Sequence, residues 1–128
     1  MNVFGIGVDI VEIARIEGVI ARQGERFLER VFTAEERAYC GGQREPARCY
    51  AARFAAKEAV SKAFGTGIGE QVGWLDLTVL RDAAGKPSLR LEGAAKAYAR
   101  EVGVGEVLIS LSHSEHYAVA QALAMRLR

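Results

Sequence analysis

Residues 53–69 read RFAAKEAVSKAFGTGIG, an alanine-rich helical segment that runs directly into a glycine-rich loop. The sequence predicts that this helix begins near Pro46, a residue suited to a first turn, and ends at Phe64. Apolar residues surround the helix nearly completely, which is typical of a buried helix, and the small ones can pack closely against a sheet. We therefore expect a cleft or an interface where its polar side chains lie: Arg53, Lys57, Glu58, Ser61 and Lys62.

The composition is that of a folded globular protein, because half of the 128 residues are hydrophobic and only two are proline. One domain over residues 1–128 is expected. The net charge of +1 predicts no general affinity for nucleic acid or membranes, and no apolar run is long enough to span a bilayer. The spacing of Cys40 and Cys49 matches no zinc or redox pattern and no signal peptide is visible, so we expect a cytoplasmic protein with two free thiols.

Residues 3–11, VFGIGVDIV, alternate as a β-strand does. Both faces are apolar or bare, which predicts a central strand rather than an edge strand. Asp9 shares its face with Gly5 and Gly7, and an ionised carboxylate in such a place needs a cation or hydrogen-bond donors. Glycines there would let another element approach the backbone closely. The alternative is a helix-capping or turn aspartate, because a helix can begin near residue 12.

The rest of the chain predicts short helices and strands. Helices are expected over 12–22 and about 25–32, and a third should follow the capping box of Thr33 and Glu36 and stop at Gly41-Gly42. Two strands over 74–81 and 88–91 should form a hairpin, followed by a helix over 92–102 and strands over 106–114 and 117–127. The expected fold is therefore a small α+β domain, with a long central helix packed on a largely antiparallel sheet.

Asp9 and Glu58 form the most informative combination of polar residues. Mg²⁺ binds through one or two carboxylates, keeps several waters and completes its shell with substrate phosphate oxygens. Lys62 lies one helical turn after Glu58, although an ordinary i, i+4 salt bridge between the two is the alternative. Because the GTGIG loop follows its helix, the helix dipole there repels anions, and a phosphate would need a metal, side chains or loop amides.

His113 lies on the apolar side of its predicted strand, where it is either a satisfied core residue or a donor to a phosphate. Arg15, Val19 and Arg22 share one helical face; an ordinary solvated face is the alternative, because acidic residues interleave. No serine or cysteine shows a nucleophile constellation, so no covalent protein intermediate is expected. The residues alone favour a Mg²⁺-dependent site for a phosphorylated ligand.

Five motifs in this chain resemble those of the holo-[acyl-carrier-protein] synthases, the small class of 4′-phosphopantetheinyl transferases. They are GIGVDIVEIARI at 5–16, FTAEE at 32–36, RFAAKEAVSKAFGTGIG at 53–69, GKP at 85–87 and LISLSHS at 108–114. They occur in the order found in the family and cover essentially the whole chain. The resemblance implies transfer of 4′-phosphopantetheine from coenzyme A to a serine of apo acyl carrier protein, with 3′,5′-ADP as the other product, in fatty acid biosynthesis.

The resemblance also implies residue roles. Asp9 and Glu58 match the magnesium-binding carboxylates, and with Lys62 they form the catalytic set, in which Glu58 takes the serine proton directly or through a metal-bound water. Arg15 and Arg22 match positions that bind the acidic carrier protein. Coenzyme A would be bound by residues along the central helix, its loop and the last motif: Arg53, Lys62, Gly65, Thr66, Gly67, His113 and Ser114.

The family forms homotrimers with active sites between subunits, so the resemblance implies that His113 serves the Glu58 of a neighbouring chain. The larger surfactin-type transferases carry a second acid two residues after the aspartate, where this chain has Val11. Water would then take the place of that ligand. Two alternatives stay open: the same chemistry on a polyketide or other secondary carrier protein, and a nucleotide-binding trimer without catalysis.

Overall fold

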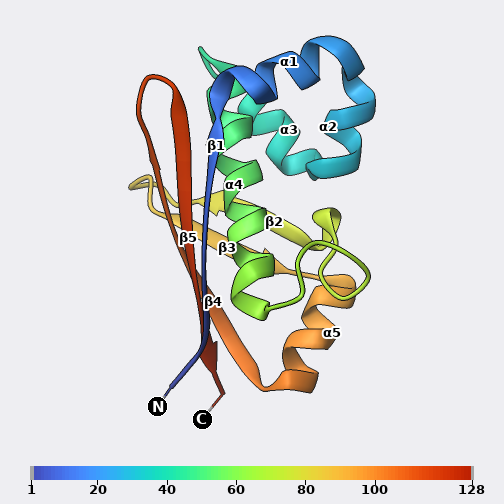
Figure 1. Ribbon diagram of the computed structural model, residues 1–128, viewed down its shortest axis with the longest axis vertical. Coiled ribbons are helices and arrows are strands. Elements are labelled where there is room, and N and C mark those ends of the chain that lie inside the picture. The colour runs from blue at the N-terminus through green and yellow to red at the C-terminus, as the bar shows by residue number, and fades with distance from the viewer. Residues whose placement is uncertain (1, 128) are drawn as a thin grey trace.

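The long helix α4 (Pro46–Phe64) is the axis of the molecule, seen in a computed structural model that describes residues 2–127. It packs against a three-stranded antiparallel sheet in the order β1-β5-β4, formed by β1 (Val3–Glu12), β5 (Tyr117–Arg126) and β4 (Val104–His113) (Figure 1). The helix begins and ends where the sequence predicts, and Gly65 caps it in the left-handed conformation.

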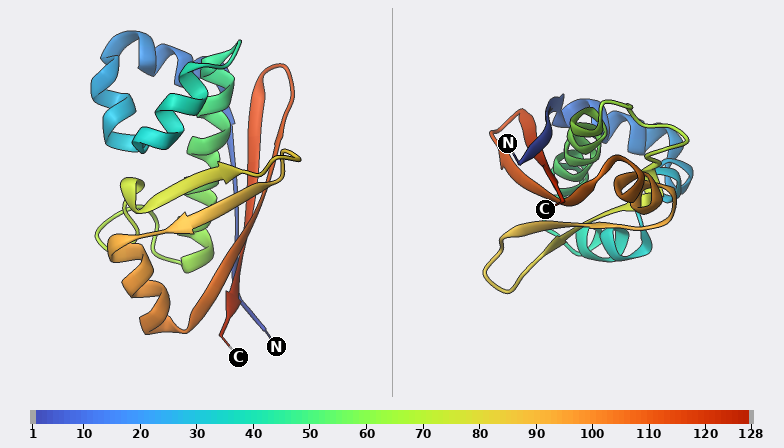
Figure 2. Two further views of the ribbon diagram at one scale, coloured as in Figure 1. Left: turned by 180° about the vertical axis from the view of Figure 1, so that it is seen from behind. Right: turned by 90° about the horizontal axis from the view of Figure 1, so that it is seen from below.

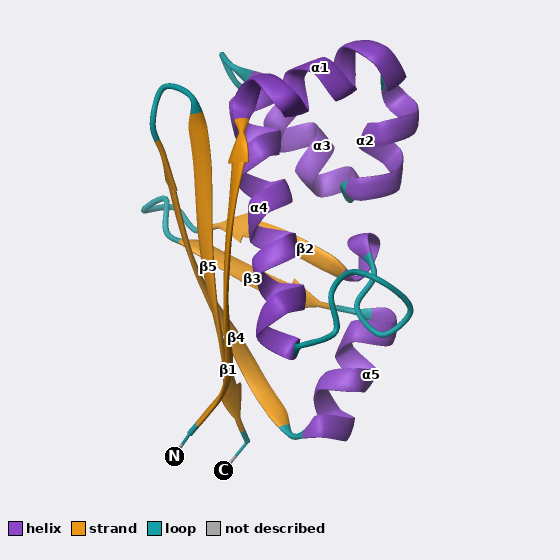
Figure 3. Ribbon diagram, viewed as in Figure 1, coloured by secondary structure: helices purple, strands orange, loops and turns teal. Residues whose placement is uncertain are grey.

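Shorter elements surround this core (Figures 2 and 3). Helices α1 (Ile13–Gln23), α2 (Glu25–Val31) and α3 (Ala34–Gly41) gather around one end of α4. The hairpin of β2 (Leu77–Arg81) and β3 (Pro87–Leu91) crosses α4, and α5 (Gly93–Val102) lies near its other end. The predicted α+β fold is confirmed. A short 3₁₀ turn occupies Trp74–Asp76, so the strand expected from residue 74 begins at Leu77.

Helix α4 and the sheet approach each other closely because both surfaces carry small residues. The buried face of β5 consists of four alanines: Ala118, Ala120, Ala122 and Ala124. On β1, a Cβ at Gly5 would lie 2.0 Å from the Ala63 carbonyl oxygen, and one at Gly7 would lie 1.9 Å from that of Ala59. The predicted close approach at these glycines is confirmed, and it fixes where Asp9 lies relative to α4.

The outer face of the sheet is apolar and exposed. Ile6 is 68% exposed, Ile10 is 61% exposed, and Val8 and Leu108 are also exposed. The prediction that β1 is a central strand is wrong, because β5 occupies the centre and β1 lies at an edge. The sequence pattern indicated burial on both faces, whereas the fold of one chain covers only one of them.

Helix α4 buries more of its polar residues than the sequence indicated. Lys57 and Ser61 are fully buried and Arg53 nearly so, and the expectation that Lys57 and Ser61 line a cleft is wrong. The Ser61 hydroxyl donates to the Glu58 carbonyl of its own helix. Lys57 instead pairs with Glu36, the residue of the confirmed capping box. Among the described residues, no helix combines the length and apolarity needed to cross a membrane.

The two cysteines are bonded to each other. Cys40 at the end of α3 and Cys49 in the first turns of α4 form a disulfide with a Cα–Cα distance of 5.4 Å. The prediction of two free thiols is therefore wrong. Sequence spacing gave no signal for the bond, because the two residues meet only when α3 folds back against α4.

Candidate active site

Asp9 and Lys62 meet between β1 and α4. The Lys62 ammonium lies 3.0 Å from Asp9 Oδ1 and also donates to the Val8 carbonyl at 3.1 Å. Lys62 thus pairs with Asp9 across two elements, and the alternative of a Glu58–Lys62 salt bridge is wrong. The capping alternative for Asp9 is also wrong, because Glu12 precedes α1 and no side chain caps that helix.

Glu58 completes this carboxylate site from the preceding turn of α4. Burial raises the pKa of Glu58, and the nearby Asp9 carboxylate raises it further, whereas Lys62 and Arg15 act in the opposite direction. A divalent cation bound between Asp9 and Glu58 would offset the unfavourable effect of Asp9 on the ionisation of Glu58. Asp9, Glu58 and Lys62 are thus brought together as the sequence predicted.

The donor set fits magnesium better than a metal that needs many protein ligands. Within residues 2–127, no group of three or more histidine, cysteine, aspartate or glutamate side chains could hold a metal ion. Mg²⁺ commonly takes one or two carboxylates together with waters and phosphate oxygens. Val11, at the position of the second acid in the larger transferases, is buried and apolar, and Glu12 is exposed.

The glycine loop does not offer its first amides to an anion. The Gly65 N–H donates to the Lys62 carbonyl, and the N–H groups of Thr66 and Gly67 both donate to the Ser61 carbonyl. The Thr66 hydroxyl in turn donates to the Gly67 carbonyl. These bonds terminate α4 and occupy the amides of residues 65–67, which leaves those three N–H groups without a free hydrogen for an anion.

A second charged site lies elsewhere on the chain. A cavity of about 250 Å³ is lined by residues of the α3–α4 region, the end of β2 and the end of β4. We call it the arginine pocket after its four arginines, which are Arg44, Arg48, Arg53 and Arg81; Glu45 and His113 also line it. His113 is exposed, so the alternative of a satisfied core histidine is wrong.

Arg53 is the buried member of the arginine pocket. Only 2% of it is exposed, its Nη1 donates to Cys49 Sγ at 3.1 Å, and its guanidinium lies over the Tyr39 ring. Its Nε is buried without a hydrogen-bond partner. Burial lowers the pKa of Arg53, as does Arg81, whereas Glu36 and Tyr39 raise it. A buried cation with an unused donor is a favourable partner for an anion.

The carboxylate site and the arginine pocket occupy different sides of α4. Arg53 and Lys62 are nine residues apart, which places them about 180° apart around the helix and about 13 Å apart along it. The pocket is lined by Arg53 and His113, whereas Asp9, Glu58 and Lys62 are not among its lining residues. A single chain therefore brings the predicted site residues together in two groups.

The remaining predicted residues lie outside both groups or at their edges. Ser114 closes the β4–β5 turn, where its N–H donates to the Tyr117 carbonyl and its hydroxyl accepts from the Tyr117 N–H. Arg15 and Arg22 are exposed on α1, and Arg15 lies close enough to lower the pKa of Glu58. The face with the two arginines thus borders the carboxylate site.

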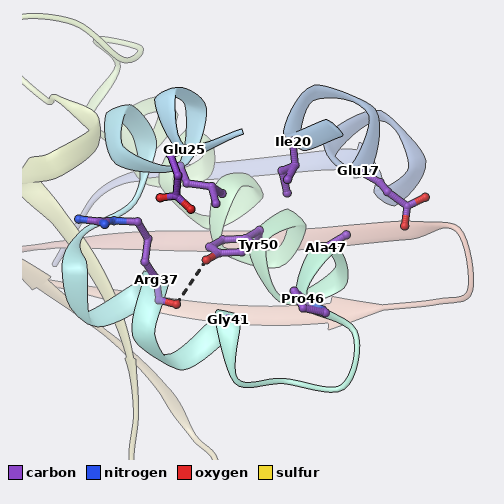
Figure 4. A pocket seen from close by; sticks show the side chains of 9 residues that line it. Glu17, Ile20, Glu25, Arg37, Gly41, Pro46, Ala47 and Tyr50 are labelled. Carbon is purple, nitrogen blue, oxygen red and sulfur yellow. Dashed lines mark hydrogen bonds between the residues drawn. The ribbon is translucent and has the colours of Figure 1, made fainter. Parts of the chain in front are cut away.

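Sequence reasoning missed Arg44, Arg48 and Arg81. Arg44 and Arg48 flank the start of α4 four residues apart, a spacing that could have marked them as neighbours. Arg81 gave no signal, because only the fold brings the end of β2 to α4. Another hollow, of about 440 Å³, lies among α1, α2, α3 and α4 (Figure 4). It contains none of the predicted site residues.

Comparison with known proteins identifies the class. The family model of the 4′-phosphopantetheinyl transferase superfamily matches residues 5–122. A holo-[acyl-carrier-protein] synthase of Moorella thermoacetica is 50% identical over 117 residues, which cover 91% of this chain and 90% of that protein. The chain therefore belongs to the 4′-phosphopantetheinyl transferase superfamily, in the group of the holo-[acyl-carrier-protein] synthases.

Solved structures agree with this assignment. The holo-[acyl-carrier-protein] synthase of Neisseria meningitidis has a TM-score of 0.90 and 36% identity, covering 95% of this chain and 98% of that one. The enzyme of Bacillus anthracis, solved in complex with CoA (3′,5′-ADP), has a TM-score of 0.83 and 39% identity, covering 98% of this chain and 99% of that one. The family resemblance seen in the sequence is confirmed.

Proposed function

We propose that this protein transfers the 4′-phosphopantetheine group of coenzyme A to a serine of apo acyl carrier protein, with Mg²⁺ held by Asp9 and Glu58. The products are holo carrier protein and 3′,5′-ADP, and the reaction serves fatty acid biosynthesis in the cytoplasm. The observation that carries the proposal is the meeting of Asp9, Glu58 and Lys62 between β1 and α4. Family membership supplies the substrates.

The residues of the carboxylate site divide the work. A bound Mg²⁺ supplies Lewis-acid polarisation and neutralises charge on the pyrophosphate. Lys62 has a half-exposed side chain, so its ammonium can pair with a phosphate oxygen as well as with Asp9. Glu58, whose pKa is raised by burial, accepts the proton of the carrier serine as that hydroxyl attacks the β-phosphorus of coenzyme A.

The arginine pocket is the natural place for other phosphate oxygens of coenzyme A. Its buried cation, Arg53, has an unused Nε donor, and His113 stands at its edge. Because the pocket and the carboxylate site lie on different sides of α4, we propose that each active site joins the carboxylate site of one subunit to the arginine pocket of its neighbour. Gly65, Thr66, Gly67 and Ser114 would pack near the nucleotide without donating the amides of residues 65–67.

A homotrimer that packs through the outer face of the sheet would provide that arrangement. The apolar outer face of the β1-β5-β4 sheet exposes Ile6, Val8, Ile10 and Leu108, which a second copy would remove from water. Arg15 and Arg22 lie exposed on α1 beside the carboxylate site and would bind acidic residues of the carrier protein. This contact would deliver the serine close to Glu58.

The test is a mass measurement on apo acyl carrier protein incubated with this protein, coenzyme A and Mg²⁺. The carrier should gain the mass of one phosphopantetheine, and chelation of the metal should stop the gain. Glu58→Gln keeps the size of the side chain and should stop transfer while the protein stays folded. If no acyl, polyketide or peptidyl carrier gains mass, the proposal is wrong; if only a secondary carrier does, the fatty-acid role is wrong.

A further inference from the structure

The disulfide Cys40–Cys49 closes a ring of chain that forms one wall of the arginine pocket. The ring covers residues 40–49, and the residues that line the pocket from it include Gln43, Arg44 and Arg48. Within this ring, residues 42–45 lie outside helix, between the end of α3 and the start of α4. Without the bond, the segment between α3 and α4 would be held mainly by short-range contacts, such as the Arg48–Glu45 ion pair at 2.9 Å.

The same bond links Cys49, which contacts Arg53, to Cys40, the neighbour of a second residue that contacts Arg53. Cys49 accepts a hydrogen bond from Arg53 Nη1 at 3.1 Å, and the Arg53 Cζ lies 4.6 Å from the centroid of the Tyr39 ring. Tyr39 immediately precedes Cys40 in α3. The disulfide therefore fixes the distance between the two sides of the Arg53 guanidinium, and Arg53 is the buried cation of the pocket.

Loss of the bond would not separate α3 from α4. The Tyr50 hydroxyl of α4 donates to the Arg37 carbonyl of α3 at 3.3 Å (Figure 4), and the Tyr50 ring packs on Phe32 at 4.7 Å between centroids. Cys40 is fully buried in this contact. The change would be confined to the pocket wall, where a free Cys49 thiol would face a guanidinium that favours its thiolate. Such a thiolate would compete with a phosphate for Arg53.

We propose that the Cys40–Cys49 disulfide is a redox-sensitive clamp on the arginine pocket, so that the oxidised protein binds phosphate groups more tightly than the reduced protein. The proposal rests on the proposed function, in which this pocket takes phosphate oxygens of coenzyme A. A dithiol reductant opens the clamp: its thiolate attacks one sulfur, a mixed disulfide forms, and its second thiol completes the exchange. The reductant becomes a disulfide, and its two hydrogens end on Cys40 and Cys49.

The cytoplasm, proposed above as the compartment of this protein, is reducing, so exchange of the disulfide can take place there. Disulfides in cytosolic proteins are usually transient and catalytic or redox-sensing rather than permanent braces. The bond lies beside the arginine pocket, which has a volume of about 250 Å³ and is lined in part by exposed side chains. Cys49 itself is only partly buried. A dithiol can therefore reach Cys49 Sγ first, and the buried Cys40 is the leaving thiol.

The experiment measures the affinity of the protein for 3′,5′-ADP, the phosphate-bearing probe, by calorimetry before and after treatment with dithiothreitol. Alkylation and mass spectrometry give the thiol count of each sample. Reduction should weaken binding about three- to tenfold, the effect of losing one well-placed hydrogen bond. The melting transition should remain cooperative. The variant Cys40→Ala/Cys49→Ala is the control, because it lacks both the bond and the thiols, and its affinity for 3′,5′-ADP should not respond to dithiothreitol.

Equal affinity of the oxidised and reduced protein would overturn the clamp, as would two alkylatable thiols in protein treated with an oxidant. A response to dithiothreitol that persists in the double alanine variant would overturn it too. If that variant does not fold, the comparison of the oxidised and reduced wild-type protein is sufficient to test the clamp. Phosphopantetheine transfer is measured on the same samples. Transfer with unchanged affinity rejects only the clamp, whereas no transfer by either form rejects the proposed function.

Discussion

Two lysines on α4 form ion pairs that differ in almost every respect. The Lys57 ammonium lies 2.6 Å from Glu36 Oε1, and both side chains are fully buried. The Lys62 ammonium lies 3.0 Å from Asp9 Oδ1, and 51% of the Lys62 side chain is exposed. Five residues of one helix therefore separate a pair closed to ligands from a pair that a ligand can enter.

The buried pair is saturated with hydrogen bonds. Lys57 also donates to the carbonyls of Val31 at 2.7 Å and Trp74 at 3.0 Å. Glu36 accepts from the N–H groups of Thr33 and Val79. Burial lowers the pKa of Lys57, and Glu36 opposes that change. This pair connects α2, α3, α4 and β2, whereas Lys62 keeps donor capacity for a phosphate.

The largest expected effect is on folding. Lys57→Met would leave Glu36 as an unpaired buried charge and remove donors from two carbonyls, so the free energy of unfolding should fall by about 3–5 kcal/mol. Denaturation with urea measures it. Lys62→Met is the matched control, because it places the same substitution on the same helix at an exposed site, and it should cost less than about 1 kcal/mol. Similar losses for both variants would contradict the division between the two pairs.

The next effect is on catalysis. In the proposed mechanism Lys62 stabilises charge on the transferring phosphate, so Lys62→Ala should lower kcat/KM for phosphopantetheine transfer about 10²–10³-fold. The circular dichroism spectrum and the urea midpoint should stay near those of the unaltered protein. A Lys62→Ala enzyme with normal turnover would remove this residue from the mechanism and leave its pair with Asp9 as a surface contact.

A substitution at Gly7 should disturb the exposed Lys62–Asp9 pair without changing either of these two residues. A methyl group at Gly7 would lie 1.9 Å from the Ala59 carbonyl oxygen, so β1 must move away from α4, at a cost of about 1–3 kcal/mol. We expect Gly7→Ala to weaken Mg²⁺ activation, seen as a higher metal concentration for half-maximal transfer, because Asp9 moves relative to Glu58. Gly105→Ala is a control that should leave metal activation unchanged, because its nearest contact would be the flexible Leu127 side chain at 2.9 Å. Unchanged metal activation in Gly7→Ala would contradict this positioning role.

The contrast between the lysines also shows what the sequence could predict. Local signals were sufficient for α4, the capping box and the alternation of β1, because each depends on residues within a few positions of one another. The sequence predicted only that Lys57 and Lys62 both lie where α4 borders a cleft or an interface. Their difference depends on Glu36 and Asp9, which reach α4 only through the tertiary fold.

The same reason explains the other errors. The Cys40–Cys49 bond and the cluster of Arg44, Arg81 and His113 form because distant segments meet at the start of α4. The edge position of β1 could not be read from a strand with two apolar faces, since a partner chain can cover a face as well as a helix can. The proposed metal-binding carboxylates, Asp9 and Glu58, were predictable because the motifs that resemble those of the family contain them.

The smallest effect concerns binding of the carrier protein. It tests whether the carrier protein docks beside the exposed Lys62–Asp9 pair. Arg22 is exposed on α1, and no influence of it on Glu58 is seen, unlike that of Arg15. Arg22→Glu should therefore raise KM for acyl carrier protein about tenfold by placing like charges opposite each other, while KM for coenzyme A and kcat stay the same. High salt should reduce the difference, because it screens exposed charges. Arg15→Glu should lower kcat as well, since it takes a positive charge from the neighbourhood of Glu58. If both variants change only KM for the carrier protein, Arg15 acts only in carrier binding. The carboxylate site then includes Lys62 but not Arg15.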